Sequence, residues 1–271
     1  MISNHGIKLD ALLDSMAGSY LKTVRYQSRN GLVCPYCGGF KSAAFSSCRS
    51  CSLVASDARN VSMTGLLADR IAMGVYAIEP ESQTLKMMYD YKEPYAPASY
   101  TNTVRAILAL AVDGHRECLD EVSGLALTGW AVVPSSTSSR RQGKPHPLQA
   151  IVRQVLPDVP EIRLLSHKDK YHRFDPDAFT LVSEQDRGCL SGNVLLIDDS
   201  WVTGGNAQSA AACLKRNGAM QVSVYCVSRI VSLDFLRQVG SNEDMTSFNT
   251  GVAYMKGYCP WHRCDEGGLM R

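Results

Sequence analysis

Apolar residues follow two kinds of spacing along this chain. An apolar residue at every third or fourth position, the period of an amphipathic helix, predicts helices over residues 7–25, 62–78, 102–119 and 148–156. Short apolar or alternating runs instead predict strands at residues 84–89, 130–133, 162–165, 194–197 and 220–226. The last two predicted strands are joined by a helix that ends near Gly218, and such a crossover places its two strands parallel in one sheet. The pattern therefore predicts an α/β fold.

One stretch, from Gly192 to Cys213, combines these elements with candidate chemistry. Its apolar run is followed at once by Asp198 and Asp199, and then by a polar turn that opens a helix. The turn consists of Thr203, Gly204, Gly205 and Asn206. A helix N-terminus has unpaired backbone N–H groups and a partial positive charge, and glycines let the backbone approach an anion closely. The turn therefore predicts a phosphate site.

The two aspartates upstream of this turn need a different ligand, because a carboxylate repels a phosphate. Vicinal hydroxyl groups can donate hydrogen bonds to carboxylates, and Mg²⁺ also prefers oxygen ligands. A phosphate beside a diol describes a ribose phosphate. The alternative interpretation is a Rossmann-like turn with an ordinary helix cap.

Four cysteines near the N-terminus form two CxxC pairs. They are Cys34, Cys37, Cys48 and Cys51, and Gly38 with Gly39 follows the first pair. Two such pairs at this separation are typical of a tetrahedral zinc site, and four thiolates leave no open position for a substrate. We therefore expect a structural zinc module. Two disulfides or a redox-active CxxC pair are the alternatives.

A second group of soft ligands lies in the C-terminal tail. Cys259, His262 and Cys264 fall within six residues, and no fourth ligand is evident beside them. A surface turn of ordinary thiols is the alternative, and residues from elsewhere in the fold or from a homodimer would complete a metal site. His115 and Cys118, in a predicted helix, are interpreted as surface or core positions rather than as ligands.

Two loops carry basic side chains. The predicted strand at residues 130–133 runs into a loop that contains Ser135, Ser136, Arg140 and Arg141, which together offer the hydroxyl and guanidinium donors that a pyrophosphate requires. A second charged segment, residues 167–179, predicts a mobile loop that could bring Lys170 or Arg173 to a leaving group. Solvated connections are the alternatives for both loops.

Composition allows these interpretations. A chain of 271 residues, 45% of them hydrophobic, can bury one substantial core beside a smaller module. The formal net charge of +2 is too small to indicate a nucleic-acid or membrane partner. Because no stretch approaches the apolar length of a membrane span or a signal peptide, we expect a cytoplasmic protein with no membrane partner.

Residues 194–206 resemble the fingerprint of the type I phosphoribosyltransferases, in which four hydrophobic residues and two acids precede a Thr-Gly-x-Thr turn. Asn206 replaces the usual final threonine, and an asparagine can still cap a helix and form hydrogen bonds. The resemblance implies that Thr203 to Asn206 bind the 5′-phosphate of phosphoribosyl pyrophosphate (PRPP) with Mg²⁺. It also implies that Asp198 and Asp199 hold the ribose hydroxyls, and that the loop after residue 133 binds the pyrophosphate.

The whole chain between residues 32 and 230 is similar to the ComF family, which is amidophosphoribosyltransferase-like and associated with competence. The similarity rests on the cysteine module, Tyr91-Lys92, the segment Val133 to Arg141, the segment Arg173 to Phe179, and the acidic fingerprint. It implies a type I phosphoribosyltransferase-like parallel sheet flanked by helices at residues 61–240. A four-cysteine zinc module at residues 1–60 would precede it, and a tail at residues 241–271 would follow. The usual Arg-Gly-Phe-Asn-Gln stretch is absent at residues 142–149.

The resulting expectation is a Mg²⁺-dependent enzyme that transfers phosphoribosyl from PRPP to an unidentified nitrogen acceptor with release of pyrophosphate. A first alternative is a PRPP sensor or DNA-uptake accessory protein without efficient turnover, for which the resemblance implies a helicase-like competence partner. A second is a zinc-ribbon protein that binds single-stranded DNA through the basic residues around the knuckles, Lys22, Arg25, Arg29, Lys41, Arg49 and Arg59.

Overall fold

The computed structural model describes residues 4–17, 20–26, 28, 30–135, 145–167, 173–251, 253–255 and 257–263. Its centre is a four-stranded sheet in the order β1-β6-β5-β2, in which every neighbouring pair is parallel. The strands are β1 (Arg70–Glu79), β2 (Leu127–Val132), β5 (Asn193–Trp201) and β6 (Gln221–Ser232). The predicted α/β class and parallel sheet are therefore confirmed.

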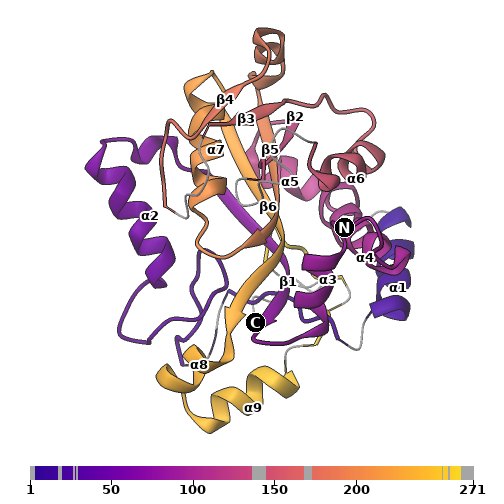
Figure 1. The fold of residues 1–271 in the computed structure, drawn as a ribbon, viewed down its shortest axis with the longest axis vertical. Coiled ribbons are helices and arrows are strands. Elements are labelled where there is room, and N and C mark those ends of the chain that lie inside the picture. Colours follow the sequence, from indigo (N-terminus) through magenta and orange to yellow (C-terminus); the bar gives the residue numbers. More distant parts are fainter. Residues whose placement is uncertain are drawn as a thin grey trace.

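Nine α-helices in the described part of the chain surround this sheet (Figure 1). They are α1 (Asn4–Ala17), α2 (Arg49–Asn60), α3 (Gln83–Asp90), α4 (Ala98–Ala109), α5 (Arg116–Ser123), α6 (Pro147–Val155), α7 (Gly205–Arg216), α8 (Leu233–Val239) and α9 (Asn242–Gly251). The shorter elements are η1 (Thr64–Leu66), the π-helix η2 (Leu110–Gly114), η3 (Glu184–Leu190) and the antiparallel pair β3 (Leu164–Ser166) and β4 (Phe179–Leu181).

The core has one apolar layer on each face of the sheet. One layer contains residues of α1, α3, α4, α5 and α6. Buried residues of β2, β5 and β6, such as Trp130, Ile197 and Tyr225, belong to the same layer. Helix α7 and the segment that carries the four cysteines, residues 22–51 (the cysteine-bearing segment), contribute to the other layer (Figure 1). The apolar run of β5 is fully buried because both of its faces are covered, which is why it has no polar alternation.

The cysteine-bearing segment is joined to the edge of the sheet. Thr23 forms an antiparallel bridge with Val75 of β1, and the N–H of Tyr76 donates to the carbonyl of Lys22 at 2.7 Å. The Tyr76 hydroxyl in turn donates to the carbonyl of Gly38 at 2.8 Å, which ties the turn directly after the first two cysteines to the strand. The segment therefore packs on the sheet through a shared core.

The expected strand at 194–197, the helix after it and the strand at 220–226 are all present, as β5, α7 and β6. Two expectations are wrong. The predicted helix at 62–78 is largely strand β1, because β1 is buried on both faces and its apolar residues do not alternate. The predicted strand at 84–89 is helix α3, whose first turn is capped by the Ser82 hydroxyl accepting from the N–H of Leu85 at 3.1 Å.

Two further helices have different limits from those predicted. Helix α1 ends at Ala17 instead of continuing to residue 25, where the chain pairs with β1. The predicted helix at 102–119 is interrupted by the π-helix η2 before α5 begins at Arg116. Within the described ranges, no helix is both long and apolar enough to cross a membrane.

Candidate functional site

The acidic pair lies at the point where two neighbouring strands lead to opposite faces of the sheet. Strand β2 is followed by α6, which packs in the first apolar layer, whereas β5 is followed by α7, which packs in the second. Between strands of this kind an open α/β sheet has a crevice outside its carboxyl edge, and ligands of such sheets bind there. Asp198 and Asp199 lie in the C-terminal half of β5, at this edge.

Three side chains from other segments contact the carboxylate of Asp199. The Tyr91 hydroxyl donates to its Oδ2 at 3.2 Å, and the ammonium group of Lys92 forms an ion pair with the same oxygen. The Nε2 atom of His146 lies 3.4 Å from that oxygen. Asp199 is 7% exposed, so these contacts compensate for the hydrogen bonds to water that the buried carboxylate has lost.

His146 is oriented by its position at the start of α6. Its ring atom Nδ1 accepts from the backbone N–H of Leu148 at 3.1 Å, and the backbone N–H of His146 donates to the side-chain oxygen of Gln149 at 2.9 Å. Because Nδ1 is an acceptor, the neutral ring carries its proton on Nε2, where it can be donated to Asp199. The capping box thus fixes both the ring and its tautomer.

The two neighbouring carboxyl groups have opposite pKa shifts. Burial, reinforced by the charge of Asp199, raises the pKa of Asp198. Burial also opposes ionisation of Asp199, but the charge of Lys92 and the contact with His146 outweigh it and hold the pKa of Asp199 below its usual range. The pair therefore holds one negative charge readily and a second one reluctantly.

The turn after β5 has a backbone that only glycine fits. Gly204 has a φ of +81°, and a Cβ atom at this position would lie 2.1 Å from the ring of Trp201. Gly204 is the N-cap of α7, and no side chain in the described part of the chain caps this helix in its place. The N–H of Gly205 donates weakly to the Thr203 hydroxyl at 3.4 Å. The turn thus presents a helix N-terminus directly after the acidic pair.

Arg229 connects this turn to the cysteine-bearing segment. Its Nη1 atom donates to the carbonyl groups of Trp201 at 2.9 Å and Val202 at 3.1 Å. A Cβ atom on Gly39 would lie 2.0 Å from the Arg229 guanidinium, so the guanidinium lies flat against that glycine. Burial alone would lower the pKa of Arg229, but the thiols of Cys37 and Cys48 raise it, so the buried side chain stays charged.

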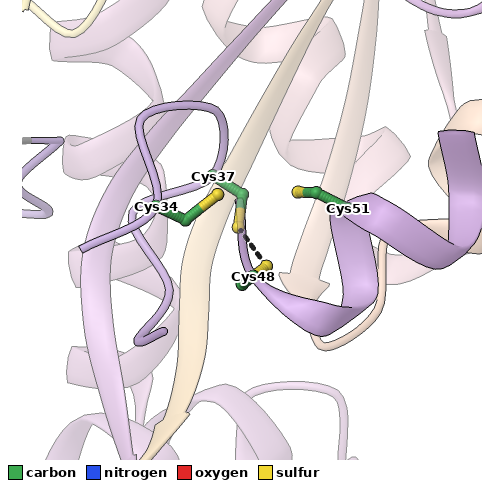
Figure 2. Close-up of side chains that lie close together, drawn as sticks. All are labelled: Cys34, Cys37, Cys48 and Cys51. Carbon is green, nitrogen blue, oxygen red and sulfur yellow. Dashed lines mark hydrogen bonds between the residues drawn. The ribbon is translucent and has the colours of Figure 1, made fainter. Parts of the chain in front are cut away.

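The four predicted zinc ligands converge. The Sγ atoms of Cys34, Cys37, Cys48 and Cys51 all lie within 4.8 Å of one another. Figure 2 shows two of them on the loop that follows Val33 and two at the start of α2, where Cys48 is the N-cap and Cys51 lies in the first turn. The sulfur atoms of Cys37 and Cys48 are 3.6 Å apart, close to the separation of about 3.8 Å between two thiolates on one tetrahedral zinc ion.

The electrostatics of the four thiols fit a metal ion. Hydrogen bonds from the other thiols, first that of Cys37, lower the pKa of Cys34, and the pKa of Cys48 is lowered as well. Hydrogen bonds with Cys34, Cys37 and Cys48 raise the pKa of Cys51 far above its usual range. Four thiolates would repel one another without a cation at their centre. The cluster could therefore hold a metal such as zinc, and the donor set is that of a closed structural site.

The other predicted residues have different positions. Ser135 lies just beyond β2, two residues after Val133, whose N–H donates to the carbonyl of Ile197 on β5. Arg173 forms an ion pair with Asp57 of α2. The remaining predicted ligands of the two loops and the tail, Ser136, Arg140, Arg141, Lys170 and Cys264, lie outside the described residues.

Three residues at the site, Lys92, His146 and Arg229, were not predicted as site residues. Tyr91-Lys92 was noted only as a family feature, and its contact with Asp199 joins segments far apart in the sequence. His146 had a usable signal, because a polar residue directly before Pro147 is typical of a helix start. Arg229 also had a usable signal, since an arginine inside the long apolar strand β6 needs a buried partner.

No family model, curated protein or solved structure matches this chain.

Proposed function

We propose that the crevice binds PRPP with Mg²⁺ and that the protein transfers the phosphoribosyl group to a nitrogen nucleophile with release of pyrophosphate. One observation carries the proposal. An acidic pair at the end of β5, with Asp199 buried and Asp198 half-buried, is followed directly by a glycine turn and a helix N-terminus, at the edge where α6 and α7 diverge. A site for hydroxyls and a site for a phosphate thus lie a few residues apart, as a ribose 5-phosphate requires.

In this proposal the two halves of the motif bind the two ends of the sugar phosphate. Asp198 and Asp199 accept hydrogen bonds from the ribose hydroxyls, and the backbone from Thr203 to Asn206 binds the 5′-phosphate. The proton that the pair retains through the raised pKa of Asp198 would be displaced when hydroxyl donors or a divalent cation arrive. Gly204 lets the chain make this turn, since its φ is positive and a Cβ atom would meet the ring of Trp201.

The chemistry is a displacement at the anomeric carbon. The bond from that carbon to the diphosphate oxygen breaks with its electron pair, the acceptor nitrogen forms the new bond, and the nitrogen then loses a proton. Positive charge develops on the sugar in the transition state, and the nearby carboxylates favour it. In this proposal Lys92, which forms an ion pair with Asp199, and the hydroxyl of Ser135 donate to the departing diphosphate. When bound, Mg²⁺ would neutralise part of the diphosphate charge.

A second candidate function is PRPP binding without efficient turnover, as in a sensor or an accessory protein. One contact of Asp199 favours it, because the ammonium group of Lys92, the proposed donor to the departing diphosphate, is already paired with that carboxylate. The departure from the family pattern at residues 142–149 points the same way. The two functions share the ligand and differ only in the release of pyrophosphate.

The test is calorimetric titration of the protein with PRPP and Mg²⁺, followed by assay of pyrophosphate release with a panel of nucleobases and amines. The variant is Asp198→Asn/Asp199→Asn, which keeps the side-chain volume but removes both charges. The control is Asp234→Asn on α8, which removes a largely exposed carboxylate whose one ion pair within the described residues is with Arg237. Thermal unfolding of each variant verifies that it is folded.

Three outcomes are distinguished. Binding that is lost in the double variant and kept in the control, with release triggered by one acceptor, supports the transferase. The same binding pattern without release from any acceptor supports the sensor. Absence of binding to the folded wild-type protein overturns both.

A further inference from the structure

Two short motifs that are far apart in the sequence meet in the apolar layer to which α4 and α5 belong. One is His115-x-x-Cys118, at the junction between the π-helix η2 and α5, and the other is Cys259-x-x-His262 in the tail. The candidate ligand atoms of His115, Cys118 and Cys259 all lie within 4.8 Å of one another, and all three residues are buried. His262 is half-buried and its ring nitrogens lie outside this group, so joining the other three requires a movement of its side chain. Each motif alone offers two ligands with the spacing of a zinc knuckle, and the fold brings the two together.

The distances within each motif match those of ligands on one tetrahedral ion. The Cys118 sulfur lies 3.7 Å from Nδ1 of His115, and the Cys259 sulfur lies 3.6 Å from Nδ1 of His262. A thiolate and an imidazole on the same zinc are separated by about 3.6 Å, given their usual bond lengths and a tetrahedral angle. The N–H of His262 also donates to the Cys259 sulfur at 3.4 Å, a contact that stabilises a thiolate.

His115 lacks the partners that a buried imidazole normally has. The residue is 3% exposed, and its Nε2 atom makes no hydrogen bond within the described chain. Its Nδ1 atom lies beside the weakly polar thiol of Cys118. Burying a polar ring with so little compensation is unfavourable, and coordination of a metal by Nδ1 would give the ring one strong interaction, with the proton on Nε2. His262 has the outer partner typical of a ligand, since its Nε2 atom lies 3.4 Å from the carboxylate of Glu121.

The tail motif is held in place by contacts that involve no metal. The indole N–H of Trp261 donates to the carbonyl of Ala111 in η2 at 2.7 Å, and its ring packs against Tyr225 of β6. The guanidinium of Arg263 lies 3.9 Å from the ring centre of Tyr26 and donates to the carbonyl of Ile71 at 3.0 Å. Segments carrying the two motifs are therefore docked against each other by direct packing.

We propose that His115, Cys118, Cys259 and His262 form a second zinc site, which fastens the C-terminal segment to η2 and α5. Two thiolates and two neutral imidazoles neutralise the charge of Zn²⁺, which suits a buried position, and they complete a tetrahedral shell with no open place for water. The role is structural. The site differs from the ligand set predicted from the tail alone, because His115 and Cys118 take the place assigned there to Cys264. It does not depend on the proposed binding of PRPP.

The first test is the zinc content of the full chain, purified under reducing conditions without added chelator and measured by elemental analysis. We expect two zinc ions per chain in the wild type and one in Cys118→Ser/Cys259→Ser. Two control variants, Cys189→Ser and Cys264→Ser, should keep both ions, because Cys189 belongs to neither cluster. One ion in the wild type, two ions in the double variant, or loss of an ion in Cys264→Ser would overturn the proposed ligand set.

A second test covers the case in which the double variant does not fold. Cobalt(II) replaces zinc in the wild type and in His262→Ala, a substitution at a half-buried residue. We expect the cobalt spectrum of the wild type to be the sum of a four-thiolate site and a two-thiolate site, and the variant to lose intensity in the d–d bands of the second site. An identical spectrum in the two proteins would exclude His262 as a ligand and contradict the proposal.

Discussion

Replacement of Arg229 by methionine tests the link between the cysteine cluster and the turn that follows the acidic pair. Methionine fills a similar volume but cannot donate to the carbonyl groups of Trp201 and Val202, which Arg229 contacts at 2.9 and 3.1 Å. A hydrogen bond to a charged group contributes about 1.5–3 kcal/mol, so two of them amount to about 3–6 kcal/mol. Removing a costly buried charge recovers part of this, and we expect the free energy of unfolding to fall by about 3 kcal/mol.

The same substitution should weaken the cysteine cluster. Four thiolates around Zn²⁺ leave an excess of negative charge, and the Arg229 guanidinium is the cation that lies against Gly39 and next to Cys37. Loss of an outer partner of this kind typically costs about 10–100-fold in metal affinity. We therefore expect Arg229→Met to release zinc to a chromogenic chelator at a lower chelator concentration than the wild type does.

Urea unfolding followed by circular dichroism measures the first effect, and chelator competition measures the second. Arg237→Met is the matched control, because Arg237 is largely exposed and pairs only with Asp234, so its loss should cost about 0.5 kcal/mol or less. If Arg229→Met and Arg237→Met lose the same stability and hold zinc equally well, Arg229 does not couple the cluster to the turn, and the reasoning fails.

Three further predictions follow from the site. Gly204→Ala should destabilise the protein by about 1–3 kcal/mol in urea unfolding, because its φ is positive and the new methyl group meets the ring of Trp201, whereas Gly65→Ala, with open space around it, should cost far less. Because the pKa of Asp198 is raised in the folded state, the folded protein binds more protons at this group than the unfolded chain does, and its stability should fall as pH rises above the unfolded-state pKa. Asp198→Asn should flatten this fall when the free energy of unfolding is measured as a function of pH. An unchanged slope of the free energy against pH in the variant would contradict the prediction. Removal of zinc from the four-cysteine cluster by a chelator should lower the melting temperature, and zinc, but not magnesium, should restore it.

The sequence was sufficient where one continuous segment carries both the structure and the chemistry. The run from β5 into α7 was predicted because a fully buried strand, two acids and a glycine turn are all local signals. The grouping of the four cysteines was predicted for the same reason, since each CxxC pair is a local sequence signal. Strand β1 was misassigned because burial on both faces removes the alternation that distinguishes a strand from a helix.

What could not be predicted depends on contacts between distant segments. Lys92 and His146 reach Asp199 only because α3 ends and α6 begins at the same edge of the sheet. The pairing of His115 and Cys118 with the tail is equally hidden, since neither motif has more than two ligands of its own. Local spacing identifies the chemistry of a residue, but the topology decides which residues share a site.

The proposed function rests on the binding of PRPP, and calorimetric titration with PRPP and Mg²⁺ tests it most directly. The account predicts saturable binding to the wild-type protein and to Asp234→Asn, and no binding to folded Asp198→Asn/Asp199→Asn. Equal binding to all three proteins would place the ligand elsewhere, and absence of binding to the wild type would contradict the assignment of the crevice.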